Sequence, residues 1–144
     1  MKTDLSIATV AAQMELAQQV LGLTHQQMIA LGREHQLVLT LCSDPLIRRE
    51  EFAIEINYQI SLECQFYSPL DGMLRDVCQY SVLYLEHEAD AAPYFAWCKQ
   101  FQPTQLEDQW RVPETSVLIT HYVLRNGNCR FVFVRDGGEP ESRP

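Results

Sequence analysis

The sequence predicts an α+β fold, in which an N-terminal helical hairpin packs on a mostly antiparallel, curved sheet of four to five strands that ends in a β-hairpin. Three observations lead to this prediction. Apolar residues recur at helical spacing in residues 5–36, polar and apolar residues alternate strictly over residues 52–66, and Asn126-Gly127 separates two strand-like runs near the end of the chain.

The helical segment divides at Gly22. Thr24 offers a hydroxyl for an N-cap and Gln27 follows three residues later, which is the capping-box pattern. We therefore predict two helices, the second beginning at Thr24. One long helix that tolerates the glycine is the alternative.

Strands follow the helices. Residues 37–41 form a short apolar run, and residues 52–66 are predicted to form one long strand with a buried and a wet face. The buried set is Phe52, Ile54, Ile56, Ile60 and Leu62, and the exposed set includes Glu55, Gln59 and Glu63. Residues 79–87 predict a further strand.

The last third contains a helix, a loop and a hairpin. Residues 88–102 are helical in pattern, but Pro93 favours a start near Ala91 or Ala92. Residues 103–113 are predicted to be a loop. Residues 116–124 and 129–135 then form a hairpin around Asn126-Gly127, where a type I′ turn would set Leu124 opposite Cys129 and Tyr122 opposite Phe131.

Composition indicates a single globular domain over residues 1–135 and a disordered, polar tail over residues 136–144. The 144 residues carry a net charge of −8 and 47% apolar residues, which excludes a disordered protein. No apolar run is long enough to span a bilayer and no signal peptide is evident, so we expect a cytoplasmic protein without membrane contact. The five cysteines have no metal-ligand spacing and are interpreted as buried, reduced thiols.

The function predicted first is protein binding by a non-catalytic regulator, chaperone or adaptor domain. No catalytic motif is readable, the second half is acidic, and aromatic residues crowd residues 94–110. The predicted binding residues are Tyr94, Trp97, Glu107, Asp108 and Trp110. The expected partner is another protein, and the acidity of this chain favours a basic one. A homodimer is also possible. No cofactor or metal is predicted.

A helix-turn-helix regulator is the first alternative. Gly22 in a turn, Thr24 as a cap, Met28 and Leu31 as apolar residues, and the polar run from Arg33 to Leu37 resemble the helix-turn-helix of excisionase- and MerR-type DNA-binding domains. The resemblance covers about a quarter of the chain. It implies DNA contacts by His25, Gln26, Gln27 and Arg33, although nucleic-acid binding usually needs more cations than these.

A small-molecule pocket on a curved sheet, catalytic or ligand-binding, is the second alternative, with His121, Tyr58 and Glu55 as its lining. The carboxylates and imidazole of Glu86, His87, Glu88 and Asp90 could bind a hard divalent cation. The favoured interpretation of that run is acidic capping of the helix that follows.

Overall fold

The computed structural model describes residues 9–135 and shows an α+β chain with one antiparallel sheet of eight strands. The strand order is β1-β2-β3-β4-β8-β7-β6-β5. The prediction of four to five strands is therefore wrong, because short strands and one hidden turn escaped the sequence patterns. The predicted disordered tail, residues 136–144, lies outside the described residues.

The strands are β1 (Leu39–Asp44), β2 (Arg49–Asn57), β3 (Ile60–Gln65), β4 (Tyr80–Leu85), β5 (Gln102–Pro103), β6 (Gln109–Val112), β7 (Val117–Val123) and β8 (Cys129–Arg135). The helices are α2 (Val10–Gln19), α3 (His25–His35) and α4 (Ala92–Cys98), with short 3-10 turns η1 (Pro45–Ile47) and η2 (Glu88–Ala91). Across residues 9–135, every helix is too short or too polar to traverse a bilayer.

The break between the first two helices is confirmed. Gly22 has φ 82°, a left-handed conformation that favours glycine. The Thr24 hydroxyl accepts a hydrogen bond from the Gln27 backbone N–H at 3.2 Å, and the Gln27 side chain accepts one from the Thr24 N–H at 2.9 Å. This is the predicted capping box, and it begins α3.

The long strand predicted over residues 52–66 is instead the β2–β3 hairpin. Glu55 pairs with Ser61 and Asn57 pairs with Ile60, which leaves Ile56 as an extra, bulged residue. A two-residue turn alone would set the apolar positions of one strand beside the polar positions of the next. The bulge places apolar positions of one strand beside apolar positions of the next. The alternation of apolar and polar residues therefore continues through the turn, and the hairpin resembles one long strand in the sequence.

The faces of that segment agree with the prediction in part. Phe52, Ile54 and Leu62 are buried, whereas Ile56 and Ile60 are only partly buried. Glu55 is exposed as predicted, but Gln59 and Glu63 are half-buried.

The predicted loop over residues 103–113 is also wrong, because it contains the second residue of β5 and all of β6. These strands are two and four residues long, too short for a periodic pattern to be read. They extend the sheet beyond β7, where Trp110 pairs with Ile119 and Val112 pairs with Val117.

The hairpin of β7 and β8 is present with a register one residue away from the predicted one. Tyr122 pairs with Arg130 and His121 pairs with Phe131, while Gly127 alone in the turn has positive φ, at 86°. Asn126 is not at positive φ, so the turn is not type I′. The one-residue shift turns every side chain of β7 to the opposite face.

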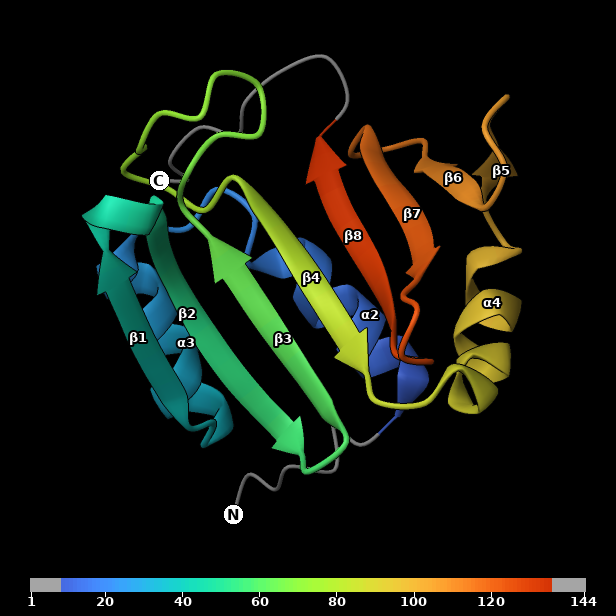
Figure 1. Cartoon of the computed structure of the whole chain (residues 1–144), viewed down its shortest axis with the longest axis horizontal. Helices are drawn as coiled ribbons and strands as arrows, with labels where there is room; N and C mark the ends of the chain where they lie inside the picture. The colour runs from blue at the N-terminus through green and yellow to red at the C-terminus, as the bar shows by residue number, and fades with distance from the viewer. Residues whose placement is uncertain (1–8, 136–144) are drawn as a thin grey trace.

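The helices α2, α3 and α4 lie on one face of the sheet, and Figure 1 views the other face. The Ser81 hydroxyl of β4 donates to the Ala17 carbonyl of α2, the His25 ring of α3 stacks on Phe66, and Phe95 of α4 contacts Phe131 of β8. The hydrophobic core is enclosed between these helices and the sheet. We call the other side of the sheet the open face; within residues 9–135 no helix covers it.

Candidate functional site

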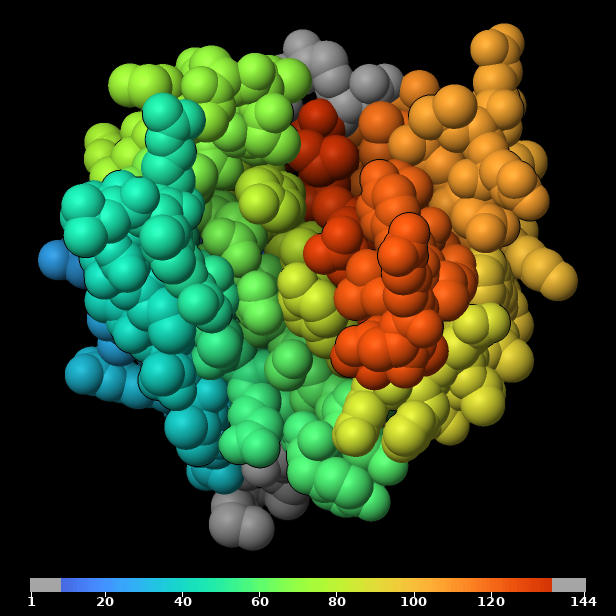
Figure 2. Space-filling model, in the orientation of Figure 1, coloured from blue at the N-terminus to red at the C-terminus, as the bar shows by residue number. Residues whose placement is uncertain are grey.

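The open face carries a row of side chains that crosses five neighbouring strands. Glu55, Ser61, Tyr84 and Arg130 are successive partners across β2, β3, β4 and β8, and Tyr122 of β7 follows Arg130. Partners in antiparallel strands point to the same face, so these side chains form a line across the sheet. Figure 2 shows this face, hollowed along its centre between the blue-green β2 side and the red β7–β8 side.

A hollow of about 710 Å³ lies on the β4–β8–β7 side of the row, and we call it the basic hollow. Among residues 9–135 its lining includes Arg130 and Arg135 and no carboxylate. Tyr80, Tyr84 and Tyr122 also line it, over an apolar floor that includes Val82. Val82 is 4% exposed.

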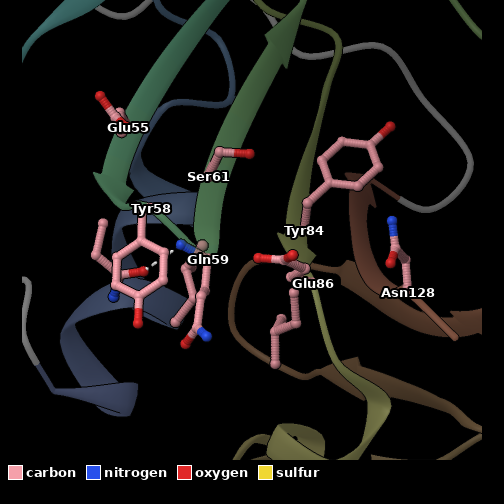
Figure 3. A pocket seen from close by; sticks show the side chains of 10 residues that line it. Glu55, Tyr58, Gln59, Ser61, Tyr84, Glu86 and Asn128 are labelled. Atoms are coloured by element: carbon pink, nitrogen blue, oxygen red, sulfur yellow. Dashed lines mark hydrogen bonds between the residues drawn. The ribbon is translucent and has the colours of Figure 1, made fainter.

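A second hollow of about 470 Å³, the acidic hollow, adjoins the first at Tyr84. Tyr58 and Gln59 come from the β2–β3 turn, Glu86 follows β4, and Asn128 comes from the β7–β8 turn (Figure 3). The Glu86 N–H donates to the Gln59 carbonyl at 2.9 Å, which ties the end of β4 to that turn. Of the part of the chain that the structure describes, the lining includes two carboxylates, Glu55 and Glu86, and no lysine or arginine.

Arg130 is held by an aromatic ring. Its guanidinium carbon lies 5.6 Å from the centre of the Tyr122 ring, a cation–π contact. The Nε atoms of Arg130 and Arg135 are buried and have no hydrogen-bond partner. Among the ion pairs of residues 9–135, none joins either arginine to a carboxylate.

A pair of carboxylates lies beside the basic hollow on β2 and β3. Glu51 is 3% exposed and accepts a hydrogen bond from Arg49 Nε at 2.8 Å. The Gln65 amide donates to Glu51 at 3.1 Å and to Glu63 at 3.2 Å, and so bridges the two carboxylates. Burial and the nearby charge of Glu51 raise the pKa of Glu63 to about 7. Glu63 therefore ionises near neutral pH, where its protonated and charged forms are both populated.

No family model, no curated protein and no solved structure matches the chain. The functional argument therefore rests on the geometry of these residues.

The predicted protein-binding residues lie on the other side of the molecule from the open face, or at its edge. Tyr94 is 4% and Trp110 8% exposed, and both belong to the hydrophobic core. Trp97 is half-buried against Phe101. Glu107 and Asp108 are exposed in the β5–β6 connection. The structure thus leaves no exposed tryptophan among them, and the burial of Trp110 gives it a packing role.

The residues of the DNA-binding alternative lie on α3, and two of the four make contacts within the chain. His25 Nε2 lies 2.8 Å from a Glu50 carboxylate oxygen, and Gln27 completes the capping box. Gln26 and Arg33 are exposed. His25 and Arg33 also line an apolar groove of about 520 Å³ between α3 and β1.

The residues of the pocket alternative are only partly brought together. Glu55 and Tyr58 do share the acidic hollow, but His121 points to the helix-covered face. There it is 7% exposed between Phe95 and Phe131, and burial lowers its pKa despite the Asp108 carboxylate 3.7 Å away. In residues 9–135 no cluster of three or more His, Cys, Asp or Glu could hold a metal ion.

Sequence reasoning missed Arg130, Tyr84 and the Glu51–Glu63 pair as parts of one surface. One signal was available: Tyr80 and Tyr84 are two aromatic residues at even spacing on a strand, so they share a face. The β7 side chains that share this face depend on the register of the β7–β8 turn, and the predicted register was wrong by one residue. The pairing of Glu51 with Glu63 required the hidden β2–β3 hairpin.

Proposed function

We propose that this chain is a non-catalytic protein-binding domain and that it binds its partner with the open face of its sheet. One observation carries the proposal. Two adjoining hollows of opposite charge, one with Glu55 and Glu86 and one with Arg130 and Arg135, meet at Tyr84 on a face that no described helix covers.

The spacing of the charges suits a segment of polypeptide. Glu55 and Arg130 are separated by three strand-to-strand steps, which is about 14 Å at the usual strand spacing of ~4.8 Å. An extended segment spans that distance in about four residues. We therefore infer a partner segment with a basic side chain at the acidic hollow and an apolar side chain in the basic hollow.

The residue types on the open face are those that dominate protein interfaces. Tyrosine and arginine are enriched among residues with large binding contributions, and Tyr84 and Arg130 are partners at the centre of this face. Tyr122 is 47% exposed and is free to be covered by a partner. The net charge of −8 favours encounter with a basic partner, because opposite charges steer association.

Site-specific photo-cross-linking in the cells that produce the full chain tests the proposal. A benzophenone amino acid replaces Tyr84 in one variant and Leu106, which is 65% exposed and outside both hollows, in a matched control. We expect discrete protein adducts from position 84 that are absent from position 106. Mass spectrometry should place the adduct within a partner segment that has a basic residue near an apolar one.

Two results would overturn the proposal. One is the absence of protein adducts from position 84 in a variant that melts like the parent. The other is the same set of adducts from positions 84 and 106, which would indicate contacts without preference for the open face.

A further inference from the structure

We propose that Arg130 binds a carboxylate of the partner segment, carried next to the apolar side chain that fills the basic hollow. This inference rests on the proposed function, and it adds the chemical group that the partner must present.

The argument begins with the charge of Arg130. Its guanidinium lies in a hollow of about 710 Å³, and the described residues that line this hollow include a second arginine and no carboxylate. The Nε atoms of both Arg130 and Arg135 are buried without a hydrogen-bond partner. A partly buried cation is normally paired with an anion, and within residues 9–135 no ion pair involves Arg130, so its guanidinium is available to an anionic group of a ligand.

The guanidinium is also positioned in advance. Arg130 lies between Tyr84 and Tyr122 in the row across the sheet, and the Tyr122 ring holds it by a cation–π contact of 5.6 Å. A ligand therefore meets a side chain whose freedom is already reduced, which lowers the entropic cost of binding. A planar guanidinium with parallel N–H groups matches the two oxygens of a carboxylate.

The surroundings of Arg130 indicate what the carboxylate is attached to. Val82, Val132 and Leu118 form the apolar part of the lining, and Tyr80 and Tyr84 add aromatic rings. A partner group with a carboxylate next to an aliphatic or aromatic side chain would place the carboxylate on Arg130. Its apolar side chain would then lie on the apolar floor of the basic hollow. A doubly charged phosphate is less suited, because the chain as a whole carries a charge of −8.

A titration with a small probe tests the site directly. The probe is 3-phenylpropionate, followed by ¹H–¹⁵N NMR on the full chain, and the uncharged 3-phenylpropanamide is the matched ligand. We expect the acid to shift resonances of β4 and β8 around Tyr84 and Arg130, with at least tenfold weaker binding of the amide. Arg130→Gln should weaken the acid at least tenfold, whereas Arg125→Gln, at the exposed β7–β8 turn, should leave it unchanged.

Equal binding of acid and amide would overturn the proposal, as would unchanged acid binding by Arg130→Gln. Both variants are first compared with the parent by thermal melting, so that loss of binding is read only in folded protein. A chain that ends at Arg135 provides a further arm. If the acid binds tenfold more tightly to that chain, the carboxylate on Arg130 is one of this chain's own, from residues 136–144, and the partner assignment is wrong.

The cross-linking experiment separates this inference from the function on which it rests. With the photo-reactive residue at position 84, Arg130→Gln should reduce adduct yield at least fivefold and Arg125→Gln should not. If position 84 gives the partner adduct equally in Arg130→Gln, protein binding by the open face stands and the carboxylate inference is overturned. If position 84 gives no adduct in any variant, the proposed function itself is wrong.

Discussion

Two glutamates on neighbouring strands behave differently because of their partners. Glu51 is buried but accepts hydrogen bonds from Arg49 and Gln65, which balance its charge. Glu63 lies beside it with the Gln65 amide as its hydrogen-bond donor, and burial next to the Glu51 charge raises the pKa of Glu63 to about 7. Two carboxylates this close favour a state in which one of them keeps its proton.

Replacing Glu63 should change how stability depends on pH. Because the folded pKa of Glu63 is raised to about 7 from 4.5, its protonated form stabilises the fold at low pH and this contribution is lost as pH rises from about 4.5 through about 7. Glu63→Gln mimics the protonated side chain, so the variant should resemble the parent at pH 4.5 and exceed it in free energy of unfolding at pH 8. Urea unfolding at pH 4.5, 6 and 8 measures this.

Glu55→Gln is the matched control for that measurement, since Glu55 is exposed on the same face and the same strand pair. It should keep the pH dependence of the parent. Parallel stability curves for Glu63→Gln and the parent would show that Glu63 ionises with an ordinary pKa.

At the scale of single elements, turns decide which side chains meet. The β7–β8 turn places Gly127 at φ 86° and sets Tyr122 opposite Arg130. The predicted register would have placed Tyr122 opposite Phe131, on the helix-covered face. One residue in a turn thus determines whether the basic hollow contains its cation–π pair.

Gly127→Val should destabilise the protein by about 1–3 kcal/mol, because a β-branched residue is strained at positive φ. A Cβ at this position meets nothing within 4 Å, so the cost comes from the backbone alone. Thermal melts measure it. Gly127→Asn is the control, since asparagine tolerates the left-handed region and should cost less. Equal melting temperatures for Gly127→Val and the parent would show that the turn relaxes to another conformation.

At the scale of the whole molecule, the two faces of the sheet carry different types of side chain. The helix-covered face holds the core and four of the five cysteines, Cys64, Cys78, Cys98 and Cys129, all buried. The open face carries Arg130 and Arg135 together with Tyr80, Tyr84 and Tyr122. A hydrogen bond from Ser81 to Ala17 joins the sheet to α2, and one from Tyr94 to Gln13 joins α4 to α2.

The layering predicts how the thiols react. Burial raises the pKa of Cys98 to about 12 and that of Cys129 to about 11. A hydrogen bond with Cys78 and burial also raise the pKa of the Cys64 thiol. Only Cys42, on the edge strand β1, is partly accessible. We expect Ellman's reagent to modify one thiol rapidly in native protein and five in denaturant. Cys42→Ser should abolish the rapid phase, and two or more rapid thiols in the parent would contradict this arrangement.

Local signals were sufficient for several features. The helix break at Gly22, the capping box at Thr24 and the buried positions Phe52, Ile54 and Leu62 all follow from residues within a few positions of one another. The α+β class and the antiparallel pairing follow from the same patterns. The sequence also grouped Glu55 with Tyr58, which share the acidic hollow.

Tertiary structure alone decided the number of strands, the register of β7 on β8 and the composition of the open face. Strand pairing joins residues far apart in the chain, and its register depends on turns and bulges that leave the alternation unchanged, as Ile56 does. Arg130 acquired its place between Tyr84 and Tyr122 from three strands that separate stretches of sequence contribute. Side-chain alternation has a period of two and carries no information about which strand lies next, so only the folded sheet could assemble this surface.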